Sequence, residues 1–355
     1  MYLFYLLVLL VPLLALRKRE ATEQGDILDS RSTTCIKGIL CFYVMLHNLG
    51  LDLEGNSELK EQKCEYTGGI GVGVFFFLSA FGIIRSYQKK GNKYLKKLLL
   101  VNVPRLYIIS VAINFLTYFV CFRGAFEGRD LFMRLFNLDF FNDFNRMNRH
   151  GWYITTIITL YIIFAIVYFL CSRLKTDKKF IIACVIISLI TLGFDFGTFF
   201  ADKGGTYTRE IDAFIIGCVY ATFYDKINCF ANKYFVPGMI ISSLGFVVGL
   251  LFCEPPATYA ATLIVILVSQ RYTYYSSITH FFGKICIGVY LFLHFSSIIL
   301  NVFLSNEYLW VLINAAFIIE LSVILYAIEI CITKAIKYVS KRITVNKEHK
   351  ETTTV

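Results

Sequence analysis

Residues 68–97 read GGIGVGVFFFLSAFGIIRSYQKKGNKYLKK, and this stretch decides the fold. It begins with an apolar run, uncharged up to Arg85, that is about as long as a helix needs to be to cross a ~30 Å hydrocarbon core. A basic segment without any acidic residue follows directly. An apolar run that ends in Lys and Arg is typical of a membrane helix reaching the cytoplasmic surface. The stretch therefore predicts an integral membrane protein.

The composition of the whole chain agrees with this prediction. Of its 355 residues, 57% are hydrophobic and 17% are charged, whereas soluble domains have roughly 45–50% apolar and about 25% charged residues. The chain is therefore not a disordered protein, a secreted disulfide module or a single soluble domain. The 11 Cys residues form no CxxC pair and no metal-ligand spacing. We interpret them as free thiols that act as small hydrophobic residues, with a disulfide between Cys64 and Cys121 as the alternative.

Apolar runs bounded by charged or turn-forming residues predict the architecture. Eleven runs are candidate spans: 1–16, 34–53, 68–87, 98–122, 152–171, 180–200, 209–224, 234–253, 257–270, 281–303 and 308–333. The expected fold class is an all-α polytopic helical bundle in the membrane, with about ten to eleven transmembrane helices. We expect residues 1–33 to form an extra N-terminal helix and a basic loop, 34–333 the main membrane domain, and 334–355 a basic tail.

The distribution of positive charge fixes the expected orientation. Segments after the odd-numbered spans, together with the tail, carry 24 Lys and Arg residues, and the opposite face carries 9. Because cytoplasmic loops are enriched in Lys and Arg, we expect the N-terminus outside and the C-terminus in the cytoplasm. The net charge of +10 then reflects contact with the lipid bilayer, and no nucleic-acid partner is expected. The first run has the flanks of an anchor rather than of a cleaved signal peptide.

Ionisable side chains inside spans are costly, so each is a candidate for function. His47 lies about 20 Å into the second span, beyond the midplane, whereas Lys37 lies near its cytoplasmic end. Arg85 and Arg105 lie at span ends, where their guanidinium groups could hold an anion. The alternative for His47 is a hydrogen bond to a neighbouring helix. For the cations, the alternative is ordinary topology and contact with lipid headgroups.

Other polar residues are weaker candidates for substrate contact or support: Ser79, His150, Trp152, Tyr290, His294 and Glu320. Hydrogen bonding between helices would also explain His294, and structural pairing would explain Glu320. Trp152 also fits an aromatic belt at the membrane surface. We expect Glu329, nearer the cytoplasmic end of the last span, to meet the cations of the tail. No metal site is expected.

Several motifs follow one another along the chain: Lys37 with His47, FFFLSAF at 75–81 with Arg85, Lys96 and Lys97 ahead of Pro104 and Arg105, HGWY at 150–153, and IGVYLFLH at 287–294. Their order resembles that of acyltransferase family 3, which includes membrane O-acetyltransferases of bacterial polysaccharides and peptidoglycan. Several details depart from the family pattern: no Glu follows Trp152, where some members carry one, and run 1–16 is additional to the ten spans usual in the family. The Lys37–His47 spacing is ten rather than eleven, and Ala80 stands where Gly is common.

The resemblance implies a membrane enzyme that moves an acyl group, most often acetyl, from cytosolic acyl-CoA to a hydroxyl of an extracytoplasmic carbohydrate. His47 would either deprotonate that hydroxyl or accept the acyl group transiently. The residues expected to bind acyl-CoA are Lys37, Arg85, Lys96, Lys97 and Arg105. Acetyl-CoA is expected as a co-substrate, with no permanently bound cofactor. Two alternatives remain: a transporter or flippase for anionic or lipid-linked glycans, and a structural membrane scaffold.

Overall fold

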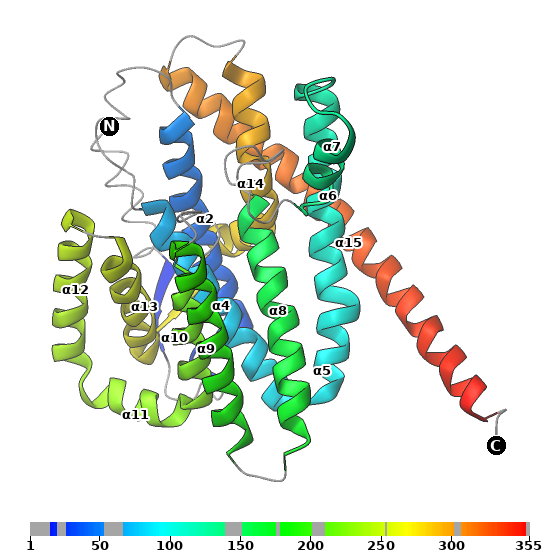
Figure 1. The fold of residues 1–355 in the computed structure, drawn as a ribbon. Coiled ribbons are helices and arrows are strands. Elements are labelled where there is room, and N and C mark those ends of the chain that lie inside the picture. The colour runs from blue at the N-terminus through cyan, green and yellow to red at the C-terminus, as the bar shows by residue number, and fades with distance from the viewer. Residues whose placement is uncertain are drawn as a thin grey trace.

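The computed structural model describes residues 15–19, 26–52, 67–138, 151–174, 178–200, 210–252, 254–301 and 307–352. Within them the chain is helical apart from one two-stranded ribbon, which confirms the all-α prediction (Figure 1). The helices are α2 (Ser30–Asp52), α4 (Thr67–Lys90), α5 (Asn92–Lys97), the π-helix η2 (Leu98–Asn102), α6 (Val103–Cys121), α7 (Gly128–Leu135), α8 (Gly151–Ser172), α9 (Lys179–Phe200), α10 (Asp212–Thr222), α11 (Tyr224–Lys233), α12 (Phe235–Phe252), α13 (Glu254–Arg271), α14 (Ser277–Asn301) and α15 (Glu307–Thr352). The ribbon pairs β1 (Leu16–Lys18) with β2 (Tyr272–Tyr274).

Six of the described helices are long and apolar enough to cross a membrane, or seven if the bent pair of α11 and α12 is one span. This makes the chain a multi-pass membrane protein, with fewer such helices than the ten to eleven expected. Most of the first predicted run lies outside the described residues. The seventh became α10, whose 11 residues reach only about 16 Å. The α2 helix forms where expected but is less apolar, since it carries Lys37, His47 and Asn48.

Helices α2 and α14 pack backbone against backbone at the centre of the bundle. A Cβ added to Gly38 of α2 would lie 1.8 Å from the Thr279 carbonyl oxygen, and one added to Gly283 of α14 would lie 1.9 Å from the Thr34 carbonyl oxygen. Only glycine permits such an approach, as small residues generally do between membrane helices. The α4 helix packs against α2, α10 and α13, and α15 packs against α14 before it extends away from the bundle (Figure 1).

The basic segment between α4 and α6 has a defined backbone. Gly91 has φ of +56°, a left-handed conformation that glycine adopts readily, and there the chain turns from α4 into α5. The π-helical turn η2 then continues into α6, where Pro104 occupies the first turn and needs no hydrogen-bond donor. This path brings Asn102 and Arg105 to the interior of the bundle.

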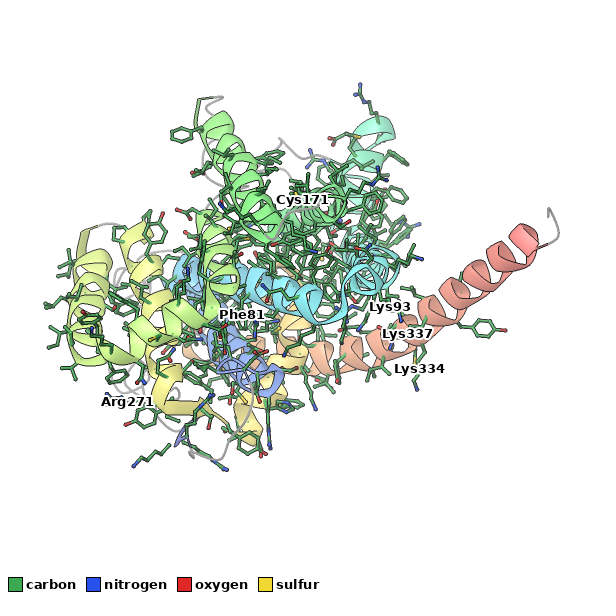
Figure 2. All side chains as sticks on the ribbon, turned by 90° about the horizontal axis from the view of Figure 1, so that it is seen from below. Phe81, Lys93, Cys171, Arg271, Lys334 and Lys337 are labelled. Atoms are coloured by element: carbon green, nitrogen blue, oxygen red, sulfur yellow. The ribbon has the colours of Figure 1, made fainter. Side chains whose placement is uncertain are left out.

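Segments expected on the cytoplasmic side meet at one end of the bundle, which we call the inner end. The β1 strand, just after the first predicted run, lies antiparallel to β2, just before α14. Asp26, ahead of α2, forms ion pairs with Arg85 and Lys89 at the end of α4. Seen from below, Lys93, Lys334 and Lys337 gather on one flank and Arg271 lies on the other (Figure 2). The chain before α2 therefore ties together helix ends that are far apart in sequence.

Candidate active site

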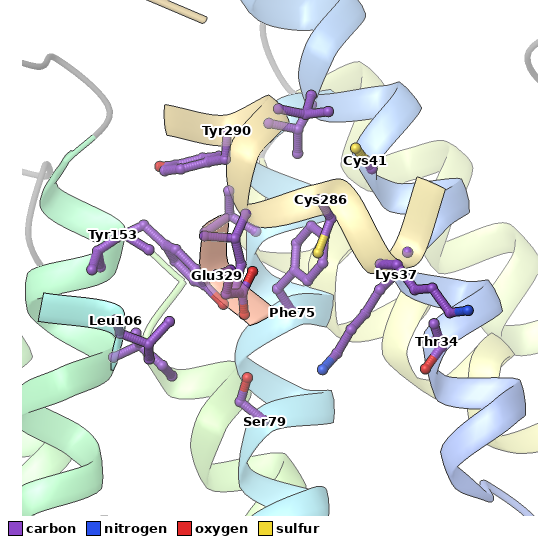
Figure 3. Close-up of a pocket in the computed structure, with 18 of the residues that line it drawn as sticks. Thr34, Lys37, Cys41, Phe75, Ser79, Leu106, Tyr153, Cys286, Tyr290 and Glu329 are labelled. Atoms are coloured by element: carbon purple, nitrogen blue, oxygen red, sulfur yellow. The ribbon is translucent and has the colours of Figure 1, made fainter. Parts of the chain in front are cut away.

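A cavity of about 330 Å³ lies among α2, α4, α6, α8, α14 and α15, with side chains also from η2 (Figure 3). Six different helices each supply a polar side chain to its wall, among them Lys37, Ser79, Arg105, Tyr153, Tyr290 and Glu329. Apolar side chains fill the surface between them, so the cavity combines an apolar wall with a few polar groups. Binding sites for small molecules commonly have this character.

One stripe of α2 forms the wall nearest the inner end. Thr34, Lys37, Cys41 and Val44 follow one another at intervals of three and four residues, which places them on a single helix face. Lys37 therefore points its ammonium group into the cavity rather than into lipid, as Figure 3 shows. It lies within electrostatic reach of Arg105 and of the Cys286 thiol. The cavity wall thus carries Lys37 of α2 and Arg105 of α6, and also Lys284 of α14.

Arg105 and Glu329 form an ion pair across the cavity wall. The Nη1 atom of Arg105 lies 3.1 Å from the Oε1 atom of Glu329, and their side chains are 27% and 13% exposed. The expectation that Glu329 meets the cations of the tail was wrong, because α15 passes beside α6 at this level. A partly buried Arg paired with a carboxylate is held in a fixed orientation. This pair therefore sets the direction in which the guanidinium group can meet an anion.

Three tyrosines line the side of the cavity opposite α2. Tyr153 and Tyr161 of α8 are eight residues apart on one helix face, and both lie within interaction distance of the Ser79 hydroxyl. Tyr290 of α14 meets Tyr153 with ring centroids 5.3 Å apart. The phenol and alcohol groups supply hydrogen-bond donors and acceptors along a wall that is otherwise apolar. An elongated ligand with a few polar atoms matches such a surface.

His47 lies one helical turn beyond Val44, the outermost α2 residue of the cavity wall. It is half-buried, and its imidazole packs against Gly68 at the start of α4. A Cβ added to Gly68 would lie 2.1 Å from the Cδ2 atom of His47, so the glycine leaves the space that the ring occupies. The rise along α2 from Lys37 to His47 is about 15 Å. The cation and the imidazole are therefore separated by about 15 Å along the same helix, and His47 is not part of the cavity wall.

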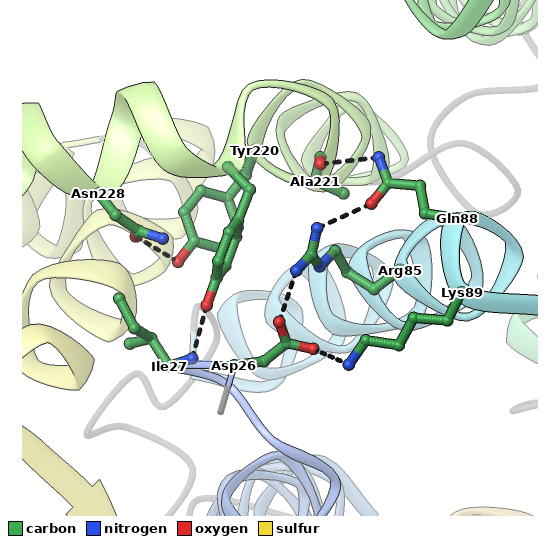
Figure 4. Close-up of polar contacts among 9 residues, drawn as sticks. Asp26, Ile27, Arg85, Gln88, Lys89, Tyr220, Ala221 and Asn228 are labelled. Atoms are coloured by element: carbon green, nitrogen blue, oxygen red, sulfur yellow. Dashed lines mark hydrogen bonds and ion pairs between the residues drawn. The ribbon is translucent and has the colours of Figure 1, made fainter. Parts of the chain in front are cut away.

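Arg85 lies outside the cavity wall, in a polar cluster at the inner end (Figure 4). Its Nη2 atom lies 2.5 Å from the Oδ1 atom of Asp26, its Nη1 atom donates to Gln88, and its Cζ atom lies 4.2 Å from the Tyr224 ring centroid. Lys89 pairs with the same carboxylate. Burial raises the pKa of Asp26, but the hydrogen bonds from Lys89 and Arg85 outweigh this, so its pKa lies below the ordinary value.

Residues 31–334 match the acyltransferase domain of family 3. The chain belongs to acyltransferase family 3. Searches of curated proteins and of solved structures returned no match. Since the match covers most of the sequence, the family 3 protein described here is a membrane-bound acyltransferase and hence a transferase enzyme.

Four of the sequence-predicted site residues of this family 3 protein meet in the cavity: Lys37, Ser79, Arg105 and Tyr290. The remaining ones lie elsewhere. Lys96 and Lys97 are exposed, and Lys97 lies within electrostatic reach of Lys337 of α15 and of Arg105. Glu320 is exposed on α15, and His294 is half-buried on α14.

The two predicted site residues of the HGWY motif, His150 and Trp152, lie outside the cavity wall or outside the described residues. Trp152 is half-buried against Phe76, with ring centroids 6.5 Å apart, and does not line the cavity. His150 lies outside the described residues. In the part of the chain that is described, no group of three or more His, Cys, Asp or Glu side chains could hold a metal ion.

Sequence reasoning missed several residues of the cavity wall: Asn102, Tyr153, Tyr161, Lys284, Cys286 and Glu329. A signal for some of them exists in the sequence. Tyr153, Ile157 and Tyr161 repeat every four residues, and Cys286 stands one turn before Tyr290, so each set shares a helix face. Glu329 stands out as an ionisable residue of the last span, but no local signal identifies its partner, because Arg105 is more than two hundred residues away.

Proposed function

We propose that this family 3 protein transfers an acyl group, acetyl in the first instance, from cytosolic acyl-CoA to a hydroxyl of an extracytoplasmic carbohydrate. One observation carries the proposal. A single cavity combines Lys37 and Arg105 with a largely apolar wall that ends one helical turn short of His47. Such a space fits the slim acyl-pantetheine arm of acyl-CoA. The carbohydrate class of the acceptor rests on the family resemblance.

The donor would be oriented by its charge. The nucleotide part of acyl-CoA is polyanionic and strongly hydrated, so it stays in water at the inner end while the uncharged arm enters between helices. Lys37 and Arg105 stand where polar atoms of that arm, or its nearest phosphate, would meet the cavity. Arg105 is held by Glu329 and needs little reorganisation on binding. These contacts position the thioester towards the outer end of α2.

His47 is the proposed catalytic residue. Its imidazole takes the proton from the acceptor hydroxyl as that oxygen attacks the thioester carbonyl. The tetrahedral intermediate then expels the CoA thiolate, which receives the proton from the imidazolium. General base catalysis of this kind contributes typically 10²–10⁴-fold. In the alternative route the Nε2 or Nδ1 atom of His47 attacks the thioester first and expels the CoA thiolate. The acceptor hydroxyl then takes the acyl group from the ring, and its proton passes to the thiolate.

The test is thioester release by the purified full-length protein in detergent or nanodiscs. We expect the wild type to release free CoA from acetyl-CoA. The rate of release by His47→Ala should be at least 100-fold lower. His349→Ala is the matched control, since this histidine lies beyond the family-matched residues 31–334. Undiminished release by a folded His47→Ala protein would remove His47 from the chemistry. Absence of thioester turnover, together with movement of glycan across the membrane, would favour the transporter.

The acceptor class is tested in cells. Glycans from cells with and without the gene are compared by mass spectrometry for O-acetyl groups. We expect acetyl content to fall when the gene is deleted and to return with the wild-type gene but not with His47→Ala. Equal acetyl content in all strains would contradict the carbohydrate assignment and leave the thioester assay to decide the reaction class.

A further inference from the structure

Two arginines stack on one tyrosine at the inner end, apart from the cluster around Asp26. The Cζ atom of Arg31 lies 3.5 Å from the Tyr275 ring centroid, and that of Arg17 lies 4.6 Å from it. We call Arg17, Arg31 and Tyr275 the ribbon pad. Arg31 belongs to α2, whereas Arg17 belongs to β1, ahead of the family-matched residues. The pad is therefore formed jointly by the acyltransferase domain and the segment before it.

The ribbon fixes the pad in place. Arg17 is opposite Thr273 in the antiparallel pair, and the Tyr275 amide donates to the Ala15 carbonyl oxygen at 2.7 Å. The Arg19 amide donates to the Arg271 carbonyl oxygen at 2.9 Å. These backbone bonds flank Arg17 on both sides. The backbone on both sides of Arg17 is therefore fixed, and the exposed side chain lies over the Tyr275 ring.

The pad has positive charge that no carboxylate neutralises among the described residues. None of the ion pairs there includes Arg17 or Arg31. Asp29, two residues before Arg31, accepts a hydrogen bond from the Ser32 amide at 2.6 Å. Hydrogen bonding from Arg31 lowers the pKa of the Tyr275 hydroxyl, which reflects the same positive field. Both guanidinium groups lie close to one ring, and an anion bound beside them would offset their positive charge.

The pad continues into the cavity of the candidate active site. Arg31 stands one turn before Thr34, a residue of the cavity wall, on the same face of α2. His280 lies within electrostatic reach of both Arg31 and Lys284, and Lys284 also lines the cavity. A line of basic groups thus leads from the surface ribbon to Lys37. Along α2 the rise from Arg31 to His47 is about 24 Å, comparable with the length of an extended acyl-CoA.

We infer that the ribbon pad binds the adenosine 3′-phosphate of the acyl-CoA donor. The inference rests on the proposed function for the choice of donor, but the charge and geometry of the pad stand on their own. Arginine binds phosphate oxygens through two parallel hydrogen bonds, whereas lysine offers a point charge. The other basic flank, with Lys93, Lys334 and Lys337, is built of lysines beside α15 (Figure 2). That flank suits lipid headgroups, and the arginine pad suits a phosphomonoester.

The experiment compares two donors that differ by one phosphate. Full-length protein in phosphatidylcholine nanodiscs is assayed for thioester release with acetyl-CoA and with acetyl-3′-dephospho-CoA. We expect Arg31→Ala to raise KM for acetyl-CoA about tenfold, with kcat nearly constant, and to leave KM for the dephospho donor unchanged. Arg31→Lys retains the positive charge without the bidentate contact, so its KM for acetyl-CoA should lie between those of the wild type and Arg31→Ala. Lys18→Ala is the matched control, because neighbouring strand residues point to opposite faces.

Direct binding separates this inference from the proposed function. Wild-type protein should bind adenosine 3′,5′-bisphosphate more tightly than adenosine 5′-monophosphate, and Arg17→Ala and Arg31→Ala should each abolish the difference. This measurement needs no turnover, so the bisphosphate can bind even if the protein releases no thioester. An equal rise in KM for both donors in Arg31→Ala, or no rise for either donor, would overturn the inference. An effect of Arg31→Ala that appears only in phosphatidylglycerol nanodiscs would assign the pad to a lipid phosphate instead.

Discussion

The substitution Gly68→Ala tests whether the position of the His47 imidazole controls activity. The new methyl group would stand 2.1 Å from the Cδ2 atom of His47, and ordinary contact begins at 3.4 Å, so the ring must move by about 1.3 Å. The obstructing atoms belong to a side chain that can rotate, and not to the backbone. A rotation away from a preferred rotamer costs about 0.5–1.5 kcal/mol, which the better helix propensity of alanine partly offsets. The fold should therefore persist.

Activity should respond far more strongly than stability. A reacting group misplaced by about 1 Å can lower a rate about 100-fold, so we expect acetyl-CoA turnover by Gly68→Ala to fall 30- to 100-fold. The thermal unfolding midpoint should change by only a few degrees. Gly82→Ala is the control, since it lies on the same helix with no atom within 4 Å of the added Cβ. A folded Gly68→Ala enzyme with wild-type turnover would refute the assigned role of the imidazole.

Three further outcomes follow from the packing and the ion pairs. Gly283→Ala should lower the unfolding free energy by about 1–3 kcal/mol or prevent folding, because the added Cβ would meet the backbone oxygen of Thr34 at 1.9 Å; a thermal melt equal to wild type would contradict the close packing of α2 on α14. Arg105→Ala should destabilise the protein by about 2 kcal/mol and raise the donor KM, and adding Glu329→Ala should restore part of the stability but not the KM; equal melting of single and double variants would show that the pair is not coupled. Because Asp26 has a lowered pKa in the fold, its contribution to stability is present above pH ~4 and is lost as the pH falls through the lowered pKa. Asp26→Asn should therefore melt below wild type at pH 7, and the gap should shrink below pH 4; a gap independent of pH would contradict the ion pairs with Arg85 and Lys89.

Several features of the site were accessible from the sequence because they depend on one helix at a time. Lys37 was expected near the cytoplasmic end of its span, and the period of an α-helix then puts Thr34, Cys41 and Val44 on the same face. The order of the motifs was enough to indicate the family that the match over 31–334 shows. The location of the cavity could not be predicted in this way, because it depends on how several neighbouring helices pack together.

The surroundings of Arg85 and Arg105, at the two ends of the basic segment between α4 and α6, could not be predicted from local sequence. Arg85 and Arg105 looked equivalent, since each stands at the end of an apolar run with cations nearby. In the fold, Arg105 enters the cavity wall because η2 carries the chain inward, whereas Arg85 faces Asp26 and Tyr224. The local pattern around a helix end does not indicate which of its sides another segment will cover.

Taken alone, the sequence determined that the chain lies in a membrane, where charged segments separate its apolar helices, and which family it belongs to. Membrane location and helix boundaries follow from hydropathy and short-range periodicity, which act within about twenty residues. The family follows from the order of motifs along the chain and from the match over residues 31–334. Only the tertiary structure decided that Glu329 holds Arg105, that Gly68 makes room for His47, and that β1 pairs with β2. Each of those contacts joins distinct helices or strands, and its energy exists only once the helices have packed.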